Sequence, residues 1–323
     1  MGEFDSIAKI KAKFASLLTP QMEGIGDDCA TLFGNPNQLF TTDILIEGVH
    51  FLRDCTSARE LGRKSLSVNL SDIAAMGGTA QASFLSVALP KSVDEDWYQE
   101  FIEGYREVSL EYGVPLLGGD TSRSLRDIAI NVLVTGTVEN NNRKCRADGQ
   151  SGDYIFVSSE LGNAAAGLKL ILNPDAICTP DQREKLIQAQ NNPTPDMELG
   201  ALLGTMPEVH AMMDVSDGVA SDLKHILNSS GLGAEVELDK IPISEELATV
   251  CRDNGWDALS LALEGGEDYC LLFTASADIS DEIMARTSSK IYCIGQLTDK
   301  CKDIKWIKNN EIQERNFRGF THF

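Results

Sequence analysis

Apolar and polar positions alternate in blocks that predict helices and strands in turn along the whole chain. Residues 3–18 carry apolar side chains at helical spacing and are followed by Pro20, so a helix is predicted there. Strands are predicted at 39–46, 83–89, 114–117, 128–138, 154–158, 234–238 and 291–294. Further helices are predicted at 58–76 and 94–112, at 161–168, and from the stretch 214–218 to about 228. We expect 114–117 to be short and buried, and 291–294 to be the last clear strand. This alternation is typical of an α/β fold class.

A polar connection near residue 140 divides the chain. With 323 residues the chain is too long for one ordinary core, so two domains are the natural expectation. Residues 140–152 are polar, contain glycine and carry Arg143, Lys144 and Arg146. We therefore predict an N-terminal domain at 1–140 and a C-terminal domain at 141–323.

Aspartates recur beside glycines, hydroxyl residues or predicted element ends. They are Asp27, Asp28, Asp43, Asp72, Asp120, Asp214 and Asp217. Some have a simple structural explanation: Thr41-Thr42-Asp43, at the expected end of a strand, fits a turn, and Ser216 or Asp217 fits a helix N-cap, although a cap explains only one of Asp214, Ser216 and Asp217. Together they exceed one general acid–base pair and suffice for several Mg²⁺ ions that share oxygen ligands. Because Mg²⁺ also binds substrate phosphates, the pattern favours phosphoryl transfer.

The predicted helix at 58–76 carries one polar stripe. Ser57 and Glu60 have capping-box spacing at its start, and two glycines follow its end. Ser65, Asn69 and Asp72 lie four and three residues apart, on one face. This stripe fits a solvated face as well as a cation site. The aspartate near the helix C-terminus opposes the helix dipole, which favours a bound cation.

Charge and cysteine usage narrow the classes of function. The net charge of −21 repels nucleic acid and anionic membranes, and it repels phosphate substrates unless cations intervene. There is no apolar stretch long enough to span a membrane, and the acidic N-terminus lacks the features of a signal peptide. Eight scattered cysteines without a Cys-x-x-Cys pair predict free thiols in a reducing cytoplasm, rather than disulfides or a zinc site.

The usual nucleotide-binding motifs are missing from the sequence. It contains no lysine-bearing phosphate loop, no protein-kinase motif set and no dinucleotide glycine motif after a first strand. The glycine turn at 161–168 could hold phosphate at a helix N-terminus, but an ordinary strand-to-helix connection is the simpler interpretation. An ATP enzyme with this sequence would use many metal ions instead of a phosphate loop.

Seven short strings, in order and spread over nearly the whole chain, resemble the thiamine-monophosphate kinase family. They are GIGDDCA at 24–30, TTD at 41–43 with VHF at 49–51, NLSDIAAMG at 69–77, GGDT at 118–121, DVSDG at 214–218, GGEDY at 265–269 and GFTHF at 319–323. The resemblance implies ATP-dependent phosphorylation of thiamine monophosphate to thiamine diphosphate with Mg²⁺, by direct in-line transfer without a covalent enzyme intermediate. It also implies the two-domain fold shared with aminoimidazole ribonucleotide synthetase, in which the sheet of the N-terminal domain forms a homodimer and a C-terminal α/β domain packs beside it.

The same resemblance assigns roles to individual positions. Metal ions would be held by Asp28, Thr41, Thr42, Asp43, Asp72, Asp120, Asp214 and Asp217, with Asp27 as a further candidate. The nucleotide would contact Gly119, Asp120, Arg146 and Ser216, with Arg146 offsetting phosphate charge. Thiamine monophosphate would contact His50, Glu267 and Phe320, with Phe320 stacking on a ring.

Two positions depart from the family pattern, and other functions stay open. Glu264 and Cys270 flank the GGEDY string where the family commonly has a small and an acidic residue, which bears on fine substrate contacts. Another ATP-dependent synthetase of the superfamily is one alternative. A metal-dependent phosphohydrolase is a second, because clustered carboxylates can activate water. An acidic cation-binding protein is a third, although the sequence lacks EF-hand spacing.

Overall fold

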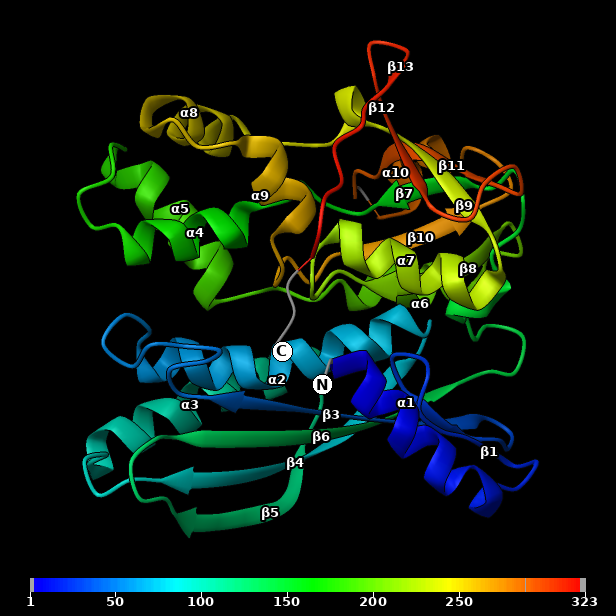
Figure 1. The fold of residues 1–323 in the computed structure, drawn as a ribbon. Helices are drawn as coiled ribbons and strands as arrows, with labels where there is room; N and C mark the ends of the chain where they lie inside the picture. The colour runs from blue at the N-terminus through cyan, green and yellow to red at the C-terminus, as the bar shows by residue number, and fades with distance from the viewer. Residues whose placement is uncertain (1–2, 288, 320–323) are drawn as a thin grey trace.

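The N-terminal half forms a six-stranded sheet covered on one face by two long helices. In the computed structural model, which describes residues 3–287 and 289–319, the strand order is β1-β2-β3-β6-β4-β5 (Figure 1). The strands are β1 (Met22–Glu23), β2 (Ala30–Leu32), β3 (Asn37–Ile46), β4 (Thr79–Leu89), β5 (Leu116–Arg123) and β6 (Ala129–Val138). The helices α2 (Ala58–Ala75) and α3 (Glu95–Tyr112) pack on the inward-facing side chains, whereas α1 (Glu3–Phe14) and the short η1 (Ala15–Leu17) precede the sheet.

The other face of this sheet is open to solvent in the single chain. Side chains of β3, β6 and β4 alternate between the helix-covered face and the open face, as the two-residue repeat of a strand requires. Ile44 and Phe84 are exposed there, at 50% and 39%. The edge strand β5 is exposed along its whole length, so the prediction of a buried strand at 114–117 is wrong. Apolar content predicted the strand correctly but could not show that it lies at an edge.

The C-terminal half builds a second, seven-stranded sheet in the order β13-β12-β9-β11-β7-β10-β8. Its strands are β7 (Tyr154–Val157), β8 (Val209–Asp214), β9 (Gly233–Glu237), β10 (Leu271–Ala275), β11 (Tyr292–Thr298), β12 (Ile304–Lys308) and β13 (Glu311–Ile312). The helical segments are η2 (Arg146–Asp148), α4 (Asn163–Leu172), α5 (Pro180–Asn191), α6 (Met197–Thr205), α7 (Val219–Ser230), η3 (Leu238–Lys240), α8 (Glu245–Asn254), α9 (Ala258–Glu264) and α10 (Ser280–Thr287). Strands β12 and β13 follow the segment 291–294, which is therefore not the last strand. Strand β12 was not predicted, because Lys305 separates its two buried residues, Ile304 and Trp306.

Local signals explain where the central helices begin and end. Ser57 and Glu60 form the predicted capping box of α2, and Gly77, with a φ of 69°, follows its end. The N-cap of α7 is Gly218, so the interpretation of Ser216 or Asp217 as that cap is wrong.

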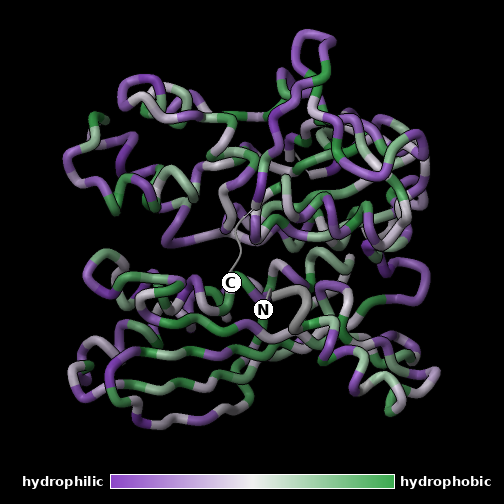
Figure 2. Tube along the Cα trace, viewed as in Figure 1, coloured by the Kyte–Doolittle hydropathy of each residue, from purple (hydrophilic) through white to green (hydrophobic). Residues whose placement is uncertain are grey.

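Helix α2 lies between the two halves and is buried along most of its length. Its outer side packs on α3 and β3, and its other side packs on α6 and β8 of the C-terminal half. Hydrophobic stretches follow the inner strands, and hydrophilic ones follow many of the outer loops (Figure 2). All eight cysteines are free thiols, as predicted. Within the described residues, no helix is both long and apolar enough to cross a membrane.

Candidate active site

Three aspartates from distant parts of the sequence meet where the two halves touch. Asp28 precedes β2, Asp72 lies in the last turn of α2, and Asp214 ends β8. One carboxylate oxygen from each lies within 4.8 Å of the others, a spacing that suits a shared cation. Neither half of the chain could form this group alone, because Asp28 and Asp72 belong to the N-terminal half and Asp214 to the C-terminal half.

The polar stripe of α2 faces this group rather than solvent. Asn69 is buried, and its side-chain oxygen accepts the backbone N–H of Asp43 at 3.0 Å. The Ser71 hydroxyl donates to Asp214 Oδ2 at 2.7 Å, and the Thr41 hydroxyl donates to Asp72. The helix therefore fixes β3 and β8 around the carboxylates with neutral hydrogen-bond donors and acceptors.

One arginine enters the group from the connection between the halves. Arg146, in η2, places Nη2 2.7 Å from Asp28 Oδ1, and its backbone N–H donates to Asp27 Oδ2 at 3.1 Å. The guanidinium is about four-fifths buried, with 19% of its side chain exposed. It neutralises part of the negative charge of Asp27 and Asp28.

Burial and neighbouring negative charges raise the pKa of several of these carboxyls, so they stay protonated at a higher pH than an ordinary aspartate. Burial, with the Asp28 charge adding to it, raises the pKa of Asp27 to about 7, of Asp43 to about 6 and of Asp214 to about 8. Burial and the charge of Asp43 raise the pKa of Asp72 well above 3.8. A bound cation would favour the ionised carboxylates and so oppose the effects of burial and of like charge. The donor atoms are all oxygens, which fits a hard divalent ion.

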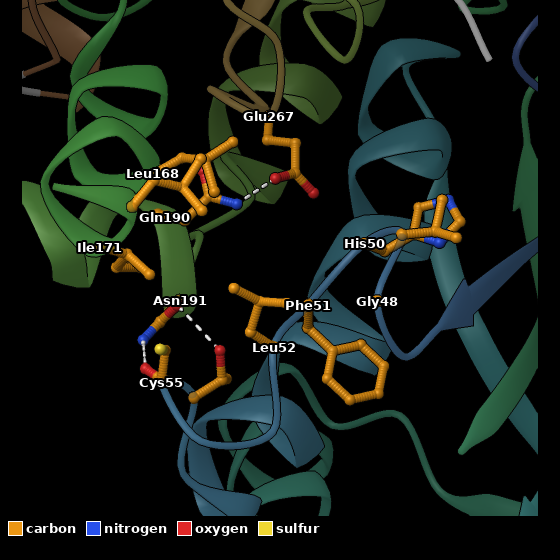
Figure 3. A pocket seen from close by; sticks show the side chains of 13 residues that line it. Gly48, His50, Phe51, Leu52, Cys55, Leu168, Ile171, Gln190, Asn191 and Glu267 are labelled. Carbon is orange, nitrogen blue, oxygen red and sulfur yellow. Dashed lines mark hydrogen bonds between the residues drawn. The ribbon is translucent and has the colours of Figure 1, made fainter. Parts of the chain in front are cut away.

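A cleft of about 560 Å³ opens beside the carboxylates. Asp43, Ser216, Asp217, His50 and Glu267 are among the residues that line it. A smaller pocket of about 220 Å³ continues past His50 and Glu267 between apolar walls, which Leu52 and Leu168 help to form (Figure 3). The His50 Nδ1 atom accepts the backbone N–H of Ile46 at 3.0 Å. A ligand in this cleft would have charged groups at the metal end and apolar groups at the far end.

Some predicted site residues are not brought together within one chain. Asp43 lies in the middle of β3, not at a strand end, and its neighbour Thr42 points to the open face, where its hydroxyl donates to Val132 O at 3.0 Å. Gly119 and Asp120 do not form a turn but lie inside the exposed edge strand β5, separated from β3 by β6 and β4. Phe320 lies outside the described residues.

Two aspartates that were not predicted as site residues hold the backbone around the site. Buried Asp222 accepts the backbone N–H of Asp217 at 3.2 Å, and burial raises its pKa well above 3.8. Asp268 accepts the N–H groups of Gly162 and Ala164 at 2.7 and 3.3 Å, so a carboxylate of the chain itself occupies the start of α4. The glycine turn is thus an ordinary connection. An aspartate within one turn of a glycine N-cap was the available signal for Asp222.

Two family models together match most of the chain, and similar proteins match it over its full length. Residues 26–138 match the family model of the AIR synthase related protein N-terminal domain, and residues 150–307 match that of its C-terminal domain. A thiamine-monophosphate kinase of Haemophilus influenzae is 38% identical, over 100% of this chain and 98% of that protein. The solved structure of AaThiL complexed with AMPPCP and TMP has a TM-score of 0.86 and 32% identity, covering 100% of this chain and 97% of that one. Thiamine-monophosphate kinase from Stenotrophomonas maltophilia has a TM-score of 0.78 and 35% identity, with 96% and 98% covered.

Proposed function

This chain belongs to the thiamine-monophosphate kinase family, and we propose that it transfers phosphate with Mg²⁺ ions held by the carboxylates that its two halves share. The reaction is ATP-dependent phosphorylation of thiamine monophosphate to thiamine diphosphate. The observation that carries the metal proposal is the group Asp28, Asp72 and Asp214, in which one oxygen of each residue lies within 4.8 Å of the others. Without bound cations, the negative charges of these carboxylates repel one another, which disfavours the ionised group.

The donor set supports Mg²⁺ at the phosphate end of the cleft. Asp28, Asp72 and Asp214 would hold ions at the centre, and Asp43 and Asp217 would hold them where the cleft begins. Such ions neutralise phosphate charge and hold ATP against the acceptor, which is most of what phosphoryl transfer requires. Direct in-line transfer needs no covalent enzyme intermediate.

The remaining residues divide between the two substrates. Arg146 and Ser216 stand beside the carboxylates and would contact the nucleotide phosphates. His50 and Glu267, at the other end of the cleft, would contact thiamine monophosphate, whose thiazolium ring carries a positive charge that Glu267 complements. The stacking role of Phe320 stays a prediction.

The open face of the first sheet supports a homodimer that completes the site. Asp120 is in register with Ser86 of β4, so it lies on the same open face as Phe84 and, through β6, as Thr42. If two copies pack by these faces, Ile44 and Phe84 become buried and Asp120 of each protomer lies at the interface, where we infer that it reaches the site of the other protomer. This arrangement would give Gly119 and Asp120 the nucleotide and metal contacts that a single chain leaves unmade.

Mixing two inactive variants tests the dimer and the role of Asp120 together. Asp43→Asn and Asp120→Asn proteins are unfolded together, refolded and assayed. If Asp120 acts across the interface, half of the dimers are mixed and one of their two sites is intact, so about a quarter of wild-type activity returns. No recovery, with mixed dimers present by native mass spectrometry, would place Asp120 outside the site of the partner.

The reaction itself is tested with purified protein, ATP, Mg²⁺ and thiamine monophosphate. Thiamine diphosphate is expected by chromatography, and chelation with EDTA should stop its formation. Thiamine and aminoimidazole ribonucleotide precursors serve as control acceptors that should not react. Phosphate release that ignores thiamine monophosphate would favour a phosphohydrolase instead. Free thiols at all eight cysteines support a reducing compartment such as the cytoplasm.

A further inference from the structure

A lysine is buried behind the acceptor end of the cleft. Lys64, on α2 of the N-terminal half, is only 1% exposed. Its Nζ atom lies 2.9 Å from the backbone oxygen of Gln190 and 3.0 Å from Glu267 Oε1. A lysine is almost never buried this completely without partners, and both partners belong to the C-terminal half.

The three residues form a closed arrangement around the Glu267 carboxylate. While Lys64 engages Oε1, the side-chain amide of Gln190 donates to Oε2 (Figure 3). Gln190 lies near the end of α5 and also lines the cleft. Both oxygens of the carboxylate are thus held from behind, and neither can turn without breaking a contact.

The backbone that carries Glu267 is coupled to the metal end of the cleft. Glu267 has a φ of 67°, in the left-handed region that a residue with a side chain rarely adopts. Its N–H donates to the backbone oxygen of Ser216 at 2.8 Å, and a Cβ on Gly266 would collide with that same oxygen. A shift of Glu267 therefore also moves its contact with Ser216.

We propose that Lys64 is a positioning residue for acceptor binding, holding the Glu267 carboxylate at a fixed place in the cleft. The proposal rests on the proposed function, in which Glu267 meets the cationic ring of thiamine monophosphate. Lys64 is not among the residues that line either pocket of the described chain, so it acts through Glu267 and Gln190. Without the ammonium, the carboxylate is free to turn toward solvent, and acceptor binding loses a preorganised charge.

Another buried lysine provides a matched control. Lys144 is 6% exposed, and its Nζ donates to the backbone oxygens of Met206 at 2.9 Å and Val209 at 2.8 Å, both within the C-terminal half. Lys64→Met and Lys144→Met remove the same charge and keep most of the length of the side chain. Both are expected to lower the melting temperature, because each leaves buried acceptors without a donor.

Steady-state kinetics separate positioning from stability. Lys64→Met should raise KM for thiamine monophosphate about ten- to a hundredfold, with KM for ATP changed less than about threefold. Lys144→Met should leave both KM values near wild type. Lys64→Gln, which keeps a donor without the charge, is the milder variant if Lys64→Met does not fold, and it should raise the same KM by a smaller factor.

A double variant tests whether Lys64 acts through Glu267. In a Glu267→Gln background, Lys64→Met should add less than about a threefold further increase in KM, since the charge that Lys64 positions is already gone. Wild-type KM for thiamine monophosphate retained in a folded Lys64→Met protein would overturn the proposal, as would full additivity in the double variant. Wild-type turnover in the same assay reports separately on the reaction itself.

Discussion

Asp214 offers a test in which stability and activity move in opposite directions. Its carboxyl is buried and shares its site with other aspartates, and burial together with the charge of Asp28 raises its pKa from 3.8 to about 8. Asp214→Asn keeps the shape and leaves an oxygen to accept the Ser71 hydroxyl. The substitution removes the negative charge that would bind cations. It also removes the repulsion between Asp214 and the neighbouring carboxylates in the metal-free protein.

The magnitude follows from the pKa. Because one pKa unit is worth about 1.4 kcal/mol, holding a proton on Asp214 at pH 7 costs the fold roughly 4 kcal/mol relative to an unfolded carboxyl of pKa 3.8. Asparagine avoids that cost. At about 2 °C per kcal/mol for a chain of this length, the metal-free melting temperature should rise by up to roughly 8 °C.

The sign with pH is also fixed. A raised carboxyl pKa means that the folded state binds a proton that the unfolded state has released between about pH 4 and pH 8. The stability of metal-free wild-type protein should therefore fall as pH rises through this window, and Asp214→Asn should flatten the fall.

Differential scanning fluorimetry in EDTA and in Mg²⁺, at pH 6, 7 and 8, measures all of these effects. Mg²⁺ should raise the wild-type melting temperature most at pH 8, where protons compete least, and should raise that of Asp214→Asn much less. The variant should have lost most of its kinase activity. A metal-free variant less stable than wild type at pH 8, or wild-type stability that increases from pH 6 to 8 in EDTA, would refute the electrostatic reasoning.

Three further substitutions test separate contacts. Asp43→Asn should lose most turnover while its circular dichroism spectrum stays that of wild type; near-normal turnover would refute a metal role. Arg146→Lys should lower kcat about tenfold or more in steady-state assays, because a single ammonium cannot reproduce the two-nitrogen contact with Asp28. Asp268→Ala should lower the free energy of unfolding by about 1–2 kcal/mol in urea titrations, since the N–H of Gly162 loses its acceptor; an unchanged midpoint would remove this cap from the account of α4.

Much of the site could be predicted because its residues carry local signals. Acidic residues beside glycines or at helix ends marked Asp28, Asp72 and Asp214, and the structure gathers all three. The stripe on α2 was also recognisable, since helical spacing is independent of what the helix packs against. Its orientation was not, because a polar stripe fits solvent as well as a buried carboxylate site.

The predicted residues that a single chain does not bring together are those whose place depends on position in a sheet rather than on local sequence. Successive residues of a strand face opposite ways, so Thr42 could not share the face of Thr41 and Asp43 once all three lay inside β3. Nothing in the apolar run before Asp120 reveals that β5 is an edge strand three positions from β3. The burial of Lys64 could not be predicted for a related reason. A lysine within a helix is usually solvated, and only the packing of the C-terminal half over α2 buries this one.

Helix α2 connects the two ends of the cleft through one rigid element. Asp72 stands at the carboxylate group and Lys64 stands behind Glu267, eight residues earlier, which is about 12 Å along a helix. In the proposed arrangement, thiamine monophosphate would place its phosphate at the first position and its ring at the second. Because both partners of Lys64, and Asp214 beside Asp72, belong to the C-terminal half, any sliding of that half along α2 would disturb both ends together. The helix would therefore set the spacing between the proposed metal site and the proposed acceptor site, because the packing of the C-terminal half on it brings Asp214 to Asp72 and Glu267 to Lys64.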